Sequence, residues 1–142
     1  MFRTLTQDML VAPQISVDAV AEAKAAGVAL IINNRPEGES DDQVPGADIA
    51  AAAHAAGLDY VAIPVTHSGF SEPQVMAMVK ALQGAKGKVL AYCRSGTRST
   101  LLWALAESAQ GGDPDALTNM AAKAGYDVSP VRPLMDMLKA QA

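Results

Sequence analysis

Residues 88–99 read KVLAYCRSGTRS, and this stretch decides the fold. Residues 88–92 form an apolar run of the length of a buried β-strand, and from Ser99 onward the apolar residues recur with helical spacing. Only a short loop fits between the two. The stretch therefore predicts a buried strand that leads almost directly into a helix.

The same alternation of strand-like and helix-like segments extends along the rest of the chain. Besides 88–92, strands are predicted at 9–12, 28–33 and 60–65. Helices are predicted at 16–26, 47–56 and 71–83, from Ser99 to the glycine pair at 111–112, and over 113–125 and 129–140. The helix at 71–83 opens with the spacing of a capping box, Ser71 to Gln74. We therefore expect a single α/β domain over 1–142, with a central, mostly parallel sheet flanked by helices.

Composition excludes several classes of protein. The 142 residues are 50% hydrophobic and 18% charged, with a net charge of −4, which suits one domain with one core. The acidic balance argues against nucleic acid or a membrane surface as partner. No apolar leader-like or membrane-spanning stretch is visible, so we expect a cytoplasmic protein. The single cysteine, Cys93, excludes an internal disulfide and a zinc site with two thiolates, and we assign no metal site.

The loop after residue 92 carries the residues suited to chemistry. Cys93 stands where the backbone N–H groups and the dipole of a helix N-terminus favour a thiolate. Gly96 permits the backbone to curl these N–H groups around an anion. Arg98 offers a planar fork of donors to an oxyanion, and the Ser99 hydroxyl is expected to donate to the thiolate. We therefore assign Cys93, Arg98 and Ser99 as candidate catalytic residues.

This loop resembles the active-site loop of cysteine-based phosphatases and rhodanese-type sulfurtransferases. The order of elements is similar to that of dual-specificity phosphatases, and more closely to that of the bacterial phosphatase-like domain named for β-lactamase hydrolase-like proteins. The resemblance rests on six stretches in the same order: 31–36, 57–60, 63–65, 93–99, 102–104 and 124–127. It implies a dual-specificity-phosphatase-like fold of the phosphotyrosine phosphatase II type. Members of that family are described variously as phosphatases or sulfur transferases.

Two features favour sulfur transfer. Four residues separate Cys93 from Arg98, as is common in rhodanese loops, whereas phosphatase loops have five. The position of the phosphatases' general-acid Asp is occupied here by His67, and sulfane sulfur transfer needs no such acid. We therefore expect a cysteine-dependent sulfurtransferase that moves sulfur from thiosulfate or glutathione persulfide, through a Cys93 persulfide, to a thiophilic acceptor. The alternatives are a phosphatase with a Cys93 phosphocysteine, in which His67 or an Asp of the loop after Asn34 is the acid, and a non-catalytic module that binds a phosphorylated or sulfated ligand.

Other residues are assigned to the surroundings of the cysteine. The predicted anion-binding loop comprises Arg94, Ser95, Gly96 and Thr97. Arg94 could equally be a solvated charge on the rim of the loop. Arg35 and His67 are candidates for the wall of the site, although Arg35 could instead pair with Glu37 or Asp41. No cofactor is implied. The expected partners are a small sulfur donor and acceptor or a phosphorylated substrate, with a functional association with a persulfide-oxidising enzyme; the oligomeric state is left open.

Overall fold

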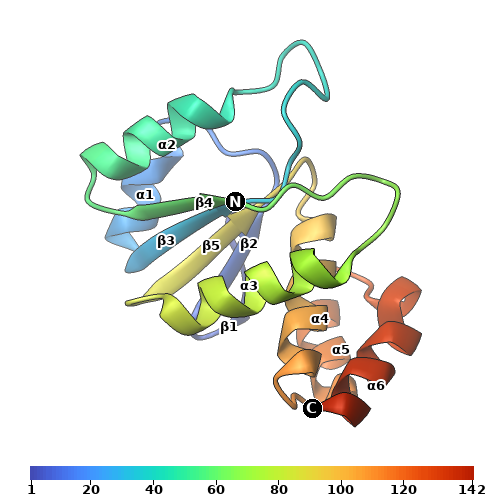
Figure 1. The fold of residues 1–142 in the computed structure, drawn as a ribbon. Coiled ribbons are helices and arrows are strands. Elements are labelled where there is room, and N and C mark those ends of the chain that lie inside the picture. The colour runs from blue at the N-terminus through green and yellow to red at the C-terminus, as the bar shows by residue number, and fades with distance from the viewer.

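Five strands form one sheet in the order β1-β2-β5-β3-β4 (Figure 1). The structure is a computed structural model that describes residues 1–142. The strands are β1 (Arg3–Thr6), β2 (Met9–Ala12), β3 (Val28–Asn33), β4 (Asp59–Ala62) and β5 (Lys88–Tyr92). β2, β5, β3 and β4 are parallel, and β1 pairs antiparallel with β2. The predicted mostly parallel sheet is confirmed.

Two strands differ from the sequence expectation. β1 was not expected, because only Leu5 of its four residues is buried and no apolar pattern marks it. The strand expected at 60–65 is shorter and covers 59–62. Beyond it, the Ile63 and Val65 N–H groups still bond to the carbonyls of Asn33 and Asn34, both at 2.9 Å. Pro64 between them has no N–H, so the regular strand ends before it.

Helices cover both faces of the sheet. They are α1 (Ala19–Ala25), α2 (Gly46–Ala55), α3 (Glu72–Gly84), α4 (Thr97–Ala109), α5 (Pro114–Lys123) and α6 (Arg132–Gln141), with a 3₁₀ turn, η1, at Ser129–Val131. In Figure 1, α1 and α2 lie on one side of the sheet, and α3 and α4 on the other, with α5 and α6 packed beyond α4. The chain thus has the layered α/β architecture that the alternating pattern predicts.

The helix ends follow local capping chemistry. The capping box of α3 is confirmed, since Gln74 N–H donates to Ser71 Oγ and Ser71 N–H donates to Gln74 Oε1. α1 begins at Ala19 rather than at residue 16, because Ser16 instead accepts the Ala19 N–H in a preceding turn. The last predicted helix is divided into η1 and α6. α4 begins at Thr97, two residues before Ser99, so Arg98 already belongs to its first turn.

The core has one part on each side of the sheet. The larger joins inward-facing residues of the sheet to α3, α4, α5 and α6, and the smaller joins the other face to α1 and α2. β5 is the middle strand, and its residues from Val89 to Tyr92 are buried. The strand therefore holds Cys93 at the carboxyl edge of the sheet, where ligands bind in open parallel sheets. None of the helices combines the length and apolar character that crossing a bilayer requires.

Candidate active site

The loop after β5 curls around the sulfur of Cys93. The Gly96 N–H donates to Cys93 Sγ at 3.1 Å, and Cys93 is fully buried. Gly96 has φ +91°, a left-handed conformation that side-chain-bearing residues rarely adopt, and it forms the N-cap of α4. The Gly96 carbonyl accepts hydrogen bonds from the N–H and the hydroxyl of Thr100, at 3.0 and 2.8 Å. The loop thus presents a backbone donor to the sulfur at the N-terminus of a 13-residue helix.

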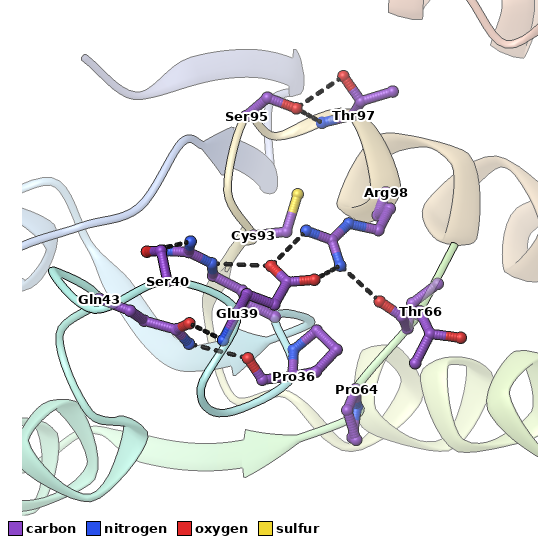
Figure 2. A network of polar contacts seen from close by, with 12 residues as sticks. Pro36, Glu39, Ser40, Gln43, Pro64, Thr66, Cys93, Ser95, Thr97 and Arg98 are labelled. Atoms are coloured by element: carbon purple, nitrogen blue, oxygen red, sulfur yellow. Dashed lines mark hydrogen bonds and ion pairs between the residues drawn. The ribbon is translucent and has the colours of Figure 1, made fainter. Parts of the chain in front are cut away.

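Arg98 lies beside Cys93 and is anchored by one of its edges (Figure 2). Nη1 donates to Glu39 Oε2 and to the Val65 carbonyl, both at 2.7 Å, and Nη2 donates to Glu39 Oε1 at 2.9 Å. A guanidinium has five N–H groups, so Nε–H and one Nη2–H make no hydrogen bond to a protein oxygen, and besides Glu39 the neighbouring Cys93 sulfur adds to the raised pKa of Arg98. These two N–H groups form a planar pair of donors of the kind that suits an oxyanion.

Glu39 accepts hydrogen bonds from two arginines. Besides Arg98, Arg35 donates to Glu39 Oε1 from Nε at 2.9 Å. The bond to Arg98 and, more weakly, the bond to Arg35 lower the pKa of Glu39 from 4.5 to about 2, against the opposing effect of burial. The same ion pair raises the pKa of Arg98. Glu39 is therefore an ionised anchor at neutral pH and holds no proton to give to a substrate.

Arg35 lies in the wall behind Arg98. Its Nη1 donates to Gln14 at 3.0 Å and its Nη2 to Ser40 at 3.1 Å, and the residue is 4% exposed. It pairs with neither Glu37 nor Asp41, the partners considered from the sequence. Glu37 instead accepts the Gly46 N–H at the start of α2, at 2.8 Å. Arg35 thus supports Glu39 rather than facing a ligand.

The Ser99 hydroxyl has a different partner from the one expected. It donates to Asn34 Oδ1 at 2.8 Å, so its single proton is not available to the Cys93 sulfur. Asn34 in turn donates from Nδ2 to the Ile63 carbonyl at 2.9 Å, and Ser99 and Asn34 are both fully buried. The pair joins the first turn of α4 to the ends of β3 and β4. The prediction that the Ser99 hydroxyl donates to the Cys93 sulfur is therefore wrong. The contacts of Ser99 make it a positioning residue.

A surface depression of about 420 Å³ borders the loop. Its lining residues are Thr66, His67, Gly69, Phe70, Arg94, Ser95, Thr97, Arg98 and Leu101. The Arg94 and His67 side chains are exposed, and Arg94 makes no side-chain hydrogen bond or ion pair. Both residues therefore line the depression with exposed side chains. Arg98 lines this depression, whereas the fully buried Cys93 does not. A hollow of about 510 Å³ near Trp103 and Glu107 contains neither residue.

Three residues of this arrangement were not found from the sequence: Glu39, Asn34 and Tyr126. Glu39 lies in a polar loop with several other acidic and amide residues, and nothing in that loop distinguishes it. Asn34 stands at the end of an apolar run, where a buried polar side chain could have been suspected. Tyr126 follows α5 and donates its hydroxyl proton to the Ser95 carbonyl at 3.0 Å.

A buried cysteine after the middle strand, a loop at a helix N-terminus and an anchored arginine together define a phosphatase-like α/β domain. The chain belongs to the family described as "Beta-lactamase hydrolase-like protein, phosphatase-like domain", whose model matches residues 1–111. The family expected from the sequence is confirmed.

Known proteins agree with this assignment. The chain is 36% identical over 108 residues to a Beta-lactamase hydrolase-like protein of Xylella fastidiosa, a match that covers 75% of this chain and 25% of the relative. This chain therefore spans a quarter of the length of that relative. The crystal structure of a putative phosphatase from Neisseria meningitidis is similar with a TM-score of 0.83 and 29% identity, over 96% of both chains.

Proteins with lower sequence identity share the fold. Tk-PTP in its active form has a TM-score of 0.74 at 12% identity and covers 99% of this chain and 97% of its own. At this identity the likeness concerns the fold alone. The phosphatase-like fold class expected from the sequence is thus confirmed by structures as well as by the family.

Proposed function

We propose that this domain is a cysteine-dependent phosphatase that forms a covalent intermediate on Cys93. The observation that carries the proposal is the anchoring of Arg98. Glu39 and Val65 accept three of the five N–H groups of the guanidinium, and Nε–H and one Nη2–H are left as a pair of donors beside the sulfur. Such a pair suits two oxygens of a phosphoryl group. The likeness to a putative phosphatase supports the same choice.

The reaction on a phosphate monoester has two steps. The Cys93 thiolate attacks phosphorus, the bond from phosphorus to the ester oxygen breaks, and the leaving oxygen takes the electron pair. Water then attacks the phosphocysteine, which releases inorganic phosphate and restores the thiolate. The Gly96 N–H and Arg98 would stabilise the negative charge on sulfur and on the phosphoryl oxygens.

The leaving oxygen also needs a proton. Glu39 is held ionised by its two arginines, and a hydrogen bond from Ser40 lowers the pKa of Asp42. His67 is the one titratable side chain between Pro64 and Phe70, and it borders the depression. We assign His67 as the proton donor, and we expect aryl phosphates, whose leaving groups need less protonation, to react faster than alkyl phosphates.

Sulfur transfer is the second candidate, and it is favoured by the four-residue spacing from Cys93 to Arg98. In this reaction the Cys93 thiolate attacks the outer sulfur of thiosulfate, the S–S bond breaks, and sulfite leaves with the electron pair. An acceptor thiolate then removes the sulfur from the Cys93 persulfide. Arg98 would bind the sulfonate oxygens of the donor in the same way as it would bind a phosphoryl group. In this case a persulfide-oxidising enzyme is the partner that would consume the product.

One preparation can be tested for both reactions. We expect hydrolysis of p-nitrophenyl phosphate with a larger kcat/KM than sulfur release from thiosulfate, and a phosphoryl adduct on Cys93 by mass spectrometry after rapid acid quenching. Cys93→Ser is the control and should abolish turnover. A one-sulfur adduct with thiosulfate turnover and no phosphate hydrolysis would replace the proposal with sulfur transfer. Binding of phosphate without turnover of either substrate would indicate a non-catalytic module.

A further inference from the structure

Tyr126 lies against the outside of the Cys93 loop. Its hydroxyl donates to the Ser95 carbonyl at 3.0 Å, and the residue is 8% exposed. A Cβ atom placed on Gly96 would overlap Tyr126 Oη and would lie 2.9 Å from the ring carbon that bears it. The tyrosine therefore packs directly on the loop at the residue whose N–H reaches the sulfur.

One peptide unit connects Tyr126 to Cys93. The Ser95 carbonyl and the Gly96 N–H belong to the same planar trans peptide, so they point in opposite directions. While Tyr126 holds the carbonyl on the outer side, the N–H must point inward, where it donates to Cys93 Sγ at 3.1 Å. Gly96 itself cannot enforce this orientation, because glycine tolerates both positive and negative φ. Within the loop, the Thr97 N–H donates to Ser95 Oγ at 3.3 Å, and Tyr126 adds a constraint on the Ser95 carbonyl from outside the loop.

Tyr126 is itself held in place by β1. Arg3 donates from Nη1 to the Ala124 carbonyl at 3.1 Å, and its guanidinium carbon lies 5.2 Å from the centre of the Tyr126 ring. Burial raises the pKa of Tyr126, so its hydroxyl keeps the proton that it donates. The antiparallel edge strand thus supports the active-site loop through Tyr126.

We infer that Tyr126 is a positioning residue that orients the Ser95–Gly96 peptide and thereby supplies the backbone donor to the Cys93 thiolate. The inference rests on the proposed role of Cys93 as the nucleophile. The other charged groups near the sulfur are Arg98 from α4, Glu39 behind that guanidinium, and Arg94 in the loop. Tyr126→Phe leaves all three in place and removes only the hydroxyl, while the ring still fills the space over Gly96.

The test compares Tyr126→Phe with Tyr60→Phe. Tyr60 is a suitable control because its hydroxyl also has one hydrogen-bond partner, Asn33 Nδ2 at 3.0 Å, but none in the Cys93 loop. Cys93 is the only cysteine, so the rate of iodoacetamide alkylation reports on it alone. The pH dependence of this rate, the kcat and KM for p-nitrophenyl phosphate and the thermal midpoint are measured for both variants and the wild type.

We expect the midpoint of the alkylation profile to move to higher pH by about 0.5 to 1 unit in Tyr126→Phe, as loss of one weak hydrogen bond to the thiolate requires. The kcat should fall about 3- to 10-fold with little change in KM, and Tyr60→Phe should match the wild type. An unchanged alkylation profile in Tyr126→Phe would overturn the inference, even if the thermal midpoint falls. Because alkylation needs no turnover, the inference can be judged even if neither proposed reaction is found.

Discussion

At the scale of single residues, Glu39 decides which edge of Arg98 faces a ligand. Its carboxylate accepts from both terminal nitrogens of Arg98 and from Nε of Arg35, and its side chain is 17% exposed. Without this anchor the guanidinium could turn and present any pair of its donors. Arg35 and Gln14 extend the chain of contacts to the segment after β2. The orientation of the two free donors of Arg98 therefore depends on a carboxylate that its arginine partners keep ionised at neutral pH.

We predict that Glu39→Gln lowers both phosphate affinity and stability. At pH 7 the free energy of unfolding should fall by roughly 1–3 kcal/mol, the range for lost charge-assisted hydrogen bonds. Because the pKa of Glu39 in the folded protein, about 2, lies below its ordinary value of 4.5, the carboxylate stabilises the fold above about pH 4.5. This contribution is lost as the pH falls towards 2. Urea unfolding between pH 7 and pH 3 should show the difference from wild type shrinking.

The control for this prediction lies in the same loop. Glu37→Gln removes a carboxylate that contacts the Gly46 N–H and neither arginine of the site. It should leave the inhibition constant for inorganic phosphate unchanged, whereas Glu39→Gln should weaken phosphate binding about tenfold or more. Equal effects of the two substitutions on phosphate binding would show that Arg98 is not positioned by Glu39.

At the scale of elements, β5, the loop and α4 form one unit whose geometry depends on Gly96. Two requirements meet at this position: a positive φ and the absence of a side chain beneath Tyr126. Gly111, just after α4, shares only the first, because its φ is +92° and no atom lies within 4 Å of a built Cβ. The two glycines therefore allow the backbone requirement to be separated from the packing requirement.

We predict that Gly96→Ala is more destabilising than Gly111→Ala. The positive φ should cost each variant about 1–2 kcal/mol, and the overlap with Tyr126 should add about 1–3 kcal/mol at Gly96 alone. Catalytic activity should be lost in Gly96→Ala and kept in Gly111→Ala. Thermal unfolding and p-nitrophenyl phosphate hydrolysis measure the two effects. Equal destabilisation of the two variants would mean that Tyr126 moves away at no cost.

At the scale of the whole molecule, the C-terminal helices complete the core around α4. Leu117 and Ala121 of α5 and Met135 of α6 belong to the same buried cluster as Leu102 and Trp103 of α4. The family model matches only residues 1–111, so these helices lie beyond the matched region. They nevertheless cover the helix that carries Arg98, and the segment after α5 carries Tyr126.

We predict that a chain ending at Gly111 does not fold cooperatively. It would expose the α4 face that α5 and α6 cover, and truncating one buried Leu or Met already costs about 2–5 kcal/mol. A chain ending at Lys139 is the control, because the last three residues are exposed. Circular dichroism melting and binding of a hydrophobic dye measure the outcome. A wild-type melting transition in the shorter chain would show that the family-matched region folds alone.

Features that depend on neighbouring residues could be predicted from the amino-acid sequence. The strand at 88–92, the loop from Cys93 to Arg98 and the helix after it are contiguous, so their apolar spacing and loop chemistry are visible in a few residues. The capping box from Ser71 to Gln74 was found for the same reason. The family resemblance likewise followed from short stretches in order. The mostly parallel sheet could be predicted because helices separate its strands in the chain.

The contacts between side chains at the site became visible only in the three-dimensional structure. Arg98 and Glu39 are 59 residues apart, Ser99 and Asn34 are 65 apart, and Tyr126 and Ser95 are 31 apart. Several carboxylates and amides in the loop after β3 could have served as partners, and local spacing does not distinguish them. Ser99 was assigned to the wrong acceptor for this reason. A hydrogen bond between distant segments depends on the path of the whole backbone, which is set by packing of the core and not by the residues that form the bond.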